Sequence, residues 1–254
     1  MSSSVQVSAE GHVATVLLCR APHNFIDLAC MTALADALEV LDADENCRAV
    51  VLGAQGKSFC AGADFSAVYA GAGMADTPAL YGQGMRLFRT RKPIVAALHG
   101  PAIGAGAGLA LVADFRIVCP ASRFSVPFNR LGFHPGFGTS FTLPRLVGPQ
   151  VAARLFFTGE RIGGDRMLAL GLADELAPYE AVLLRAQVFA QEIARSAPLA
   201  VQSTRATLRL GLAEAVQVAN AREWEIQQRE FASQDFLEGV AAAAARRLPV
   251  FTGR

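Results

Sequence analysis

Two glycine-rich segments, each placed directly after a short apolar run, constrain the fold of this chain more than any other feature. The run Arg48–Ala54 leads into Lys57–Asp64 (KSFCAGAD), and the run Pro93–Leu98 leads into Gly104–Gly108 (GAGAG). Apolar runs of this length are typical of strands that are covered on both faces. Small residues after such strands let the backbone approach a ligand closely and leave N–H groups free to point at it.

The segments around these two alternate between strand and helix patterns. His12–Cys19 and Phe115–Cys119 predict further strands, and apolar residues at helical spacing predict a helix over Leu28–Ala43. The pair Thr77-Pro78 predicts a helix start with Thr77 as the N-cap, and we expect this helix to reach about Arg91. Strands and helices in alternation indicate an α/β fold.

From Pro149 onward the pattern becomes almost wholly helical, with Ala181–Arg195 and Leu199–Phe231 as examples. We therefore expect a boundary near Ala197-Pro198. It would separate a core of residues 1–197, which carries the ligand site, from a C-terminal helical region of residues 198–254.

Charge and cysteine usage exclude several function classes. The 254 residues carry a net charge of +1, which argues against a nucleic-acid or membrane surface. The five cysteines are scattered without a C-x-x-C pair, so we expect neither a metal site nor disulfides. The first residues lack the pattern of a signal peptide, and no apolar run reaches the roughly 18 residues of a membrane span. A cytoplasmic location is the expectation.

The GAGAG segment has two readings as a ligand-binding turn. A G-x-G between a strand and a helix is found in dinucleotide-binding folds, which would make the chain an NAD-dependent oxidoreductase. That motif belongs to the first βαβ unit and needs an acidic residue about 20 positions later, whereas this segment comes third in strand order without such an acid. The alternative use is to present helix N-terminal N–H groups to developing negative charge.

Longer motifs place both segments in a familiar order. FCAGAD is followed by KPIVAALHGPAIGAGAGLALVAD, by F-x-x-P-x-x-x-L-G at Phe124–Gly132, and then by LPRLVG, FTGERI and ALGLADEL. In this order and spacing the chain resembles the crotonase (enoyl-CoA hydratase/isomerase) superfamily over nearly its whole length. The resemblance implies a crotonase-like α/β fold, with repeated ββα units in a spiral core and a C-terminal helical region that forms homotrimers or dimers of trimers.

The resemblance also implies an acyl-CoA thioester as the ligand, with coenzyme A as part of the substrate and no separate cofactor or metal. The thioester oxygen would lie between the backbone amides of Ala61 and Ala105, which form an oxyanion hole. Around it, the small and polar positions expected to bind substrate are Gly62, Ala63, Asp64 and Gly104. The apolar acyl pocket would be formed by Phe65, Tyr81, Met85 and Phe128.

The sequence departs from the superfamily where hydratases carry two glutamates. The aligned positions hold Gly108 and Phe128, so a paired general acid and base is missing. His134, in the turn LGFHPGFG, is the candidate to replace them because histidine titrates near neutrality. Weaker candidates, each with a structural alternative, are Asp64, Asn129, Arg130, Glu160, Asp114, His12, His23 and His99.

We therefore expect an acyl-CoA enzyme that stabilises an enolate, labelled enoyl-CoA hydratase by overall resemblance although its residues make standard hydration doubtful. Isomerisation, decarboxylation and C–C hydrolysis remain open as reactions. A catalytically silent acyl-CoA-binding homologue is the alternative from another class, because both glutamates are replaced.

Overall fold

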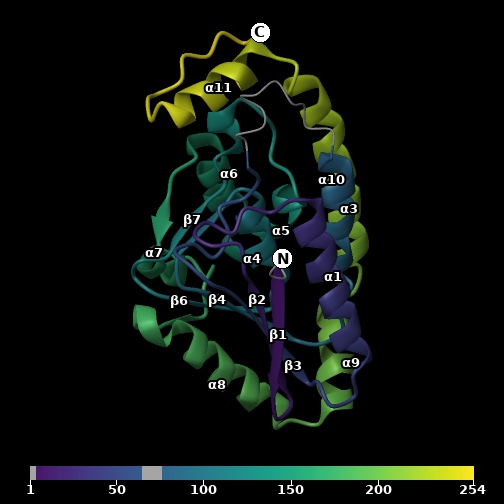
Figure 1. The fold of residues 1–254 in the computed structure, drawn as a ribbon. Helices are drawn as coiled ribbons and strands as arrows, with labels where there is room; N and C mark the ends of the chain where they lie inside the picture. The colour runs from purple at the N-terminus through teal and green to yellow at the C-terminus, as the bar shows by residue number, and fades with distance from the viewer. Residues whose placement is uncertain (1–3, 65–75) are drawn as a thin grey trace.

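Two sheets and a set of surrounding helices make up the fold in the computed structural model, which describes residues 4–64 and 76–254 (Figure 1). The larger sheet has the order β1-β2-β3-β4-β6-β9, and the smaller has the order β5-β7-β8. The strands of the larger sheet are β1 (Val5–Glu10), β2 (Val13–Leu18), β3 (Ala49–Ala54), β4 (Ile94–Leu98), β6 (Phe115–Val118) and β9 (Glu175–Leu176). Those of the smaller sheet are β5 (Pro101–Ile103), β7 (Arg123–Ser125) and β8 (Ile162–Gly163).

Helices follow or cover these strands. The first half of the chain contributes α1 (Leu28–Ala43), α3 (Thr77–Leu87), α4 (Ala105–Val112), the 3-10 helix η1 (Phe128–Leu131) and α5 (Thr139–Val147). The second half contributes α6 (Pro149–Thr158), α7 (Gly164–Ala169), η2 (Tyr179–Ala181), α8 (Val182–Ala194), α9 (Pro198–Leu208), α10 (Leu212–Glu230) and α11 (Gln234–Ala244). Among the described residues, no helix is both long and apolar enough to cross a membrane.

The central strands are covered on both faces, as their apolar sequences predict. Strands β2, β3, β4 and β6 pair in parallel. In each strand, successive side chains point to opposite faces of the sheet. Val50 and Leu52 of β3 pack into the main core with α1, whereas Val51 packs into a second cluster beneath α8. The α/β prediction is confirmed.

Element boundaries agree with the sequence where the signal is local. The helix predicted over Leu28–Ala43 has those bounds. The predicted cap at Thr77 is wrong, because Asp76 holds the N-cap position and Thr77 is already helical. That helix also ends at Leu87 instead of Arg91, because the Asp42 carboxylate accepts the backbone N–H of Arg91 at 2.8 Å and takes it out of helical pairing.

The predicted helical stretch Leu199–Phe231 is two helices. Gly211 lies between α9 and α10 with φ of +74°, a left-handed conformation that glycine adopts without strain. The sequence signal for this break was the glycine itself. Apart from that break, the predicted helical character of the region is confirmed.

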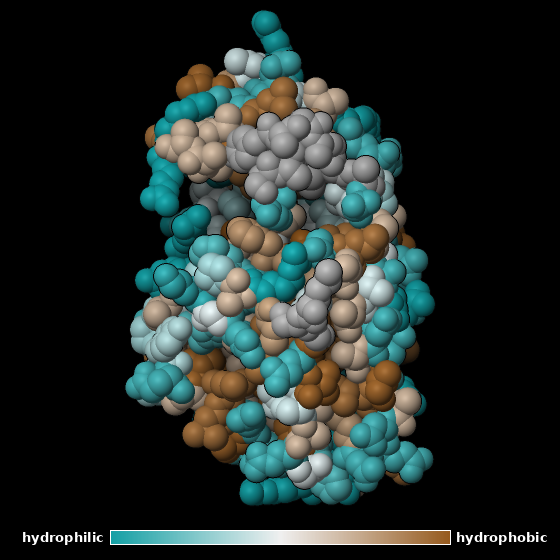
Figure 2. Space-filling view, in the orientation of Figure 1, coloured by the Kyte–Doolittle hydropathy of each residue, from teal (hydrophilic) through white to brown (hydrophobic). Residues whose placement is uncertain are grey.

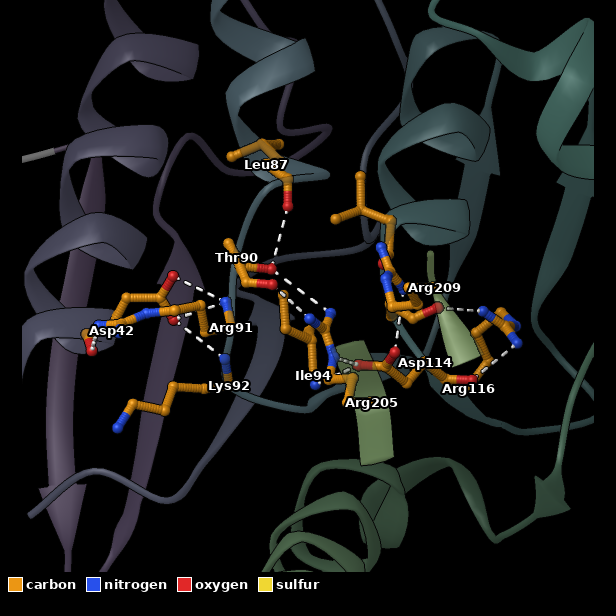
Figure 3. Close-up of polar contacts among 12 residues, drawn as sticks. Asp42, Leu87, Thr90, Arg91, Lys92, Ile94, Asp114, Arg116, Arg205 and Arg209 are labelled. Atoms are coloured by element: carbon orange, nitrogen blue, oxygen red, sulfur yellow. Dashed lines mark hydrogen bonds and ion pairs between the residues drawn. The ribbon is translucent and has the colours of Figure 1, made fainter. Parts of the chain in front are cut away.

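Asp114 joins the C-terminal helices to the sheet (Figure 3). One carboxylate oxygen accepts the backbone N–H of Ile94 at the start of β4 and also pairs with Arg205 Nε, both at 2.8 Å. Its other oxygen pairs with Arg209 Nη1 at 2.9 Å. The Asp114 and Arg205 side chains are only 15% and 8% exposed, so water screens this cluster little. Asp114 therefore fixes the start of β4.

Replacing Asp114 by Ala should therefore be strongly destabilising. The change leaves two arginines without their buried carboxylate and should lower the free energy of unfolding by about 3–5 kcal/mol. Urea unfolding followed by circular dichroism measures it. The control is Glu225→Ala, which breaks an exposed ion pair with Arg229 and should change stability by less than about 1 kcal/mol. Equal effects of the two substitutions would contradict the argument.

Candidate active site

The two glycine-rich segments lie against each other by direct backbone contact. The Cys60 amide donates to the Pro101 carbonyl and the Ile103 amide donates to the Cys60 carbonyl, each at 3.0 Å. A Cβ atom on Gly62 would lie 2.7 Å from the Ile103 carbonyl oxygen, and one on Gly106 would overlap the Cys60 carbonyl. Glycine is therefore required on both sides of this contact. The consequence is that the segment after β3 lies beside the N-terminus of α4.

One unpartnered amide comes from α4. Gly104 has φ of +57° and ψ of −120°, a conformation open to glycine, and the helix starts at the next residue, Ala105. The N–H of a first helical residue has no partner within its own helix. Among the described residues, no other group accepts a hydrogen bond from the Ala105 N–H. The Ala105 amide is thus free to bind a ligand oxygen.

The second unpartnered amide is that of Ala63, not the predicted Ala61. The Ala61 N–H donates to the His23 carbonyl at 3.0 Å and is consumed by that bond. The Gly62 N–H points back to the Cys60 sulfur. Ala63 is the next residue, and within the described chain its N–H has no acceptor. The prediction that the Ala61 amide is free to bind the thioester oxygen is therefore wrong, and the free amide of this segment is that of Ala63.

A cavity of about 640 Å³ opens at these two amides. Its walls come from the two glycine-rich segments, α3, η1 and the C-terminal helices. Most of the predicted binding residues line it: Gly62, Ala63, Asp64, Tyr81, Gly104 and Phe128, together with Ala61 and Ala105. Met85 does not line it. The predicted contact of Phe65 falls outside the described residues.

Charged groups at the cavity are mostly cationic. Arg130, Arg161 and Arg247 line it, whereas Asp64 is the one carboxylate among the described lining residues. Arg247 is paired with Glu238 at 2.6 Å, and Arg130 Nε donates to the Thr158 carbonyl at 2.9 Å. Arg161 and Arg247 were not predicted from the sequence, since nothing local shows that the turn after α6 and the end of α11 converge here.

His134 lies at a different cavity. It lines a neighbouring hollow with Glu230 and Asp235, and it does not line the cavity that holds Ala63 and Ala105. Its backbone N–H donates to Glu230 Oε2 at 2.5 Å, and its ring Nδ1 is 2.8 Å from the Pro135 carbonyl oxygen. The placement gives no support to the predicted catalytic role of His134.

The weaker candidates have structural contacts. Glu160 pairs with Arg154 at 3.0 Å, and Asn129 lines the His134 cavity. The ring nitrogens of the remaining histidines contact chain atoms away from the cavity lining. These contacts are His12 with the Asn46 carbonyl, His23 with Ser58 Oγ, and His99 with the Gly56 carbonyl.

The two positions of the missing glutamates offer no acid or base. Phe128 lies in the cavity wall with its ring 5.5 Å from that of Phe133. Gly108 faces the ring of Phe137, which occupies the space where a side chain would begin. Behind the wall, burial raises the pKa of the Cys60 thiol to about 12, so this group stays protonated at neutral pH and supplies no nucleophile.

Comparison with known proteins identifies the family. A sequence profile of the enoyl-CoA hydratase/isomerase family matches residues 8–254. Carnitinyl-CoA dehydratase of Proteus mirabilis is 33% identical over 100% of both chains. The 2,3-dehydroadipyl-CoA hydratase of Escherichia coli is 32% identical over 99% of this chain and 100% of the relative.

Solved structures agree with the sequence relatives. An enoyl-CoA hydratase/isomerase from Pseudoalteromonas atlantica has a TM-score of 0.90 at 30% identity and covers 98% of this chain and 100% of its own. Carnitinyl-CoA hydratase from Mycobacterium avium has a TM-score of 0.89 at 32% identity over 100% of both chains. The chain belongs to the enoyl-CoA hydratase/isomerase family. It is an enzyme of this family and has the crotonase-like fold.

Ala105→Pro tests the α4 amide with little risk to the fold. Proline is well tolerated at the first position of a helix, where it removes an N–H that has no helical partner. Loss of one oxyanion donor should lower kcat on an acyl-CoA ester by about 10²–10³-fold, measured in a turnover assay beside a thermal melt. Ala105→Ser keeps the amide and serves as the control. Unchanged turnover in a folded proline variant would remove this amide from the mechanism.

Proposed function

We propose that this enzyme binds an acyl-CoA thioester with its carbonyl oxygen between the amides of Ala63 and Ala105 and stabilises the enolate formed there. The observation that carries the proposal is the pair of unpartnered amides at one cavity, brought together by the Cys60 contact. Fixed backbone dipoles do not reorganise during reaction, and one such donor contributes roughly 3–4 kcal/mol to lowering a barrier.

The cavity chemistry supports a coenzyme A ester as substrate class. The relatives named above are hydratases and dehydratases of CoA esters. Coenzyme A carries phosphates, and guanidinium groups bind phosphate oxygens through paired hydrogen bonds. Arg130 and Arg161 provide such groups at the cavity, whose remaining lining is largely apolar and suited to an acyl chain and the pantetheine arm.

The reaction that follows enolate formation is constrained by the lack of carboxylates. Hydration needs one group to deprotonate water and another to protonate Cα, and the described lining contains a single carboxylate, Asp64. One carboxylate suffices for moving a proton between two carbons, and none is needed to stabilise an enolate formed by decarboxylation. Isomerisation and decarboxylation are therefore favoured over hydration, and C–C hydrolysis, which also needs an activated water, stays open.

Binding of acyl-CoA with little turnover is the second candidate. The feature that favours it is the filling of the Gly108 position by Phe137, which excludes an acid or base from that part of the site. Retention of both amides favours the enzyme, because binding alone does not require donors aimed at a developing oxyanion. A panel of CoA esters assayed for both binding and turnover separates the two candidates.

Hydration of crotonyl-CoA should be very slow. General acid or base groups contribute about 10²–10⁴-fold each, so the absence of both should leave turnover several orders of magnitude below that of a two-glutamate hydratase. Loss of the conjugated thioester absorbance measures the rate, and calorimetric titration with butyryl-CoA measures binding. Fast hydration would show that an unassigned group replaces the pair, and absence of binding would overturn the proposed substrate class.

Two substitutions then locate the proton-transfer group on whichever ester is turned over. Asp64 lines the acyl cavity and His134 lines the neighbouring one, so Asp64→Asn should lower kcat by at least about tenfold and His134→Ala should lower it much less. The reverse order would assign the chemistry to His134 after all.

The C-terminal helices support the proposal of a trimer or a dimer of trimers. Leu199 and Leu208 of α9 and Leu210 just after it are 81%, 75% and 88% exposed. Large apolar side chains that are exposed together mark a surface that contacts another chain. On the face shown in Figure 2, hydrophobic residues also gather in the lower half, where Figure 1 places α8.

Multi-angle light scattering at micromolar concentration should therefore give a mass of three or six chains. Replacing Leu199 and Leu208 together by Asp should shift the mass toward one chain, because charges at an apolar contact oppose association. The control is Val40→Asp on α1, an apolar residue that is 69% exposed outside the C-terminal region. A monomeric parent protein would refute the proposal.

A further inference from the structure

The ring of Phe137 fills a slot between α3 and α4. A Cβ atom on Gly84 of α3 would lie 2.5 Å from Phe137 Cε2, and one on Gly108 of α4 would lie 2.6 Å from its Cδ1. Both distances are shorter than any real Cβ contact. The two helices therefore present bare backbone to opposite sides of one aromatic ring, which is fully buried.

Space is what requires both glycines. Neither Gly84 nor Gly108 has a positive φ, and both lie inside helices, where alanine is ordinarily favoured over glycine by about 1 kcal/mol. Gly82 lies two residues before Gly84 on α3, and a Cβ atom built on it would have nothing within 4 Å. The ring thus needs Gly84 and Gly108 as neighbours, while Gly82 has no such role.

The backbone of Phe137 has a conformation that phenylalanine rarely adopts, and neighbouring groups hold it there. Its φ is +63°, a left-handed conformation that is rare for bulky residues. The turn is clamped by the buried Glu223 of α10, whose carboxylate oxygens accept the N–H groups of Gly138 at 2.7 Å and Ser140 at 2.9 Å. Strained conformations of this kind persist where the surroundings fix them, and they concentrate at ligand sites.

The slot lies one helical turn behind the cavity wall. Tyr81 and Ala105 line the cavity, and each is three residues before the glycine that faces the ring. The Phe137 and Tyr81 rings also meet edge to face, with centroids 6.1 Å apart at 87°. The ring of Phe137 is therefore directly beneath the residues that a bound acyl chain would contact.

From this geometry we infer that Phe137 is a specificity-determining residue, whose ring supports Tyr81 from behind the wall of the acyl cavity and so restricts the enzyme to short acyl chains. The inference rests on the proposed binding of acyl-CoA and adds the residue that sets chain length. Removing the ring leaves a space between α3 and α4 bounded by glycine backbone. A longer acyl chain can then extend into it by displacing the Tyr81 side chain.

The test compares affinities for butyryl-CoA and octanoyl-CoA by calorimetry in the parent protein, Phe137→Ala and Phe137→Gly. The glycine variant suits the left-handed backbone and guards against misfolding of the alanine variant. Each further buried methylene changes affinity by about fourfold, so the octanoyl to butyryl preference should rise by at least about tenfold in both variants. Phe124→Ala, which truncates a fully buried ring of β7 that forms no ring contact with Tyr81 among the described residues, should leave the preference unchanged.

A second measurement tests the shared space without ligand. Gly84→Ala should lower the melting temperature of the parent protein and should be tolerated in the Phe137→Gly background, whereas Gly82→Ala should not lower it in either background. An unchanged chain-length preference in folded Phe137 variants would overturn the inference and leave the proposed function intact. Absence of binding of both esters to the parent protein would overturn both.

Discussion

The backbone contact at Cys60 is the constraint on which the site depends. Hydrogen bonds in both directions join Cys60 to the strand β5, so two segments more than 40 residues apart in the chain behave as one rigid piece. Side chains at positions 62 and 106 would push them apart. An oxyanion hole needs two donors whose spacing does not change during reaction, and a direct main-chain contact provides that spacing better than side-chain packing could.

This constraint explains what could be predicted from the sequence. The apolar runs around Val50 and Val95 identified the central strands because burial on both faces leaves a local signature. The glycine-rich segments after them identified the location of the site. Which amide of the first segment is left free depended on the His23 carbonyl, which lies far away in the sequence and accepts the N–H of Ala61.

The other differences have the same origin. Met85 and Tyr81 are one helical turn apart on α3 and both belong to the main core, yet only Tyr81 lines the cavity. His134 was predicted to replace the missing glutamates, but its amide is bound by Glu230 of α10 and it lines another cavity. Arg161 and Arg247 converge from distant segments. Each outcome is set by tertiary packing that a local pattern does not encode.

The position of the Asp114 cluster has a consequence for the order in which the molecule assembles. Its carboxylate fixes the start of β4, the strand that leads toward the second glycine-rich segment, but its partner Arg205 follows 91 residues later. The cavity wall likewise includes Ala243 and Arg247, at the end of α11 and just beyond it. Contacts between residues so far apart in the chain form late in folding, because the chain loses the entropy of closing a long loop before such contacts stabilise it. During synthesis, the strands can therefore pair before the cavity exists, and ligand binding becomes available only when the C-terminal helices have docked.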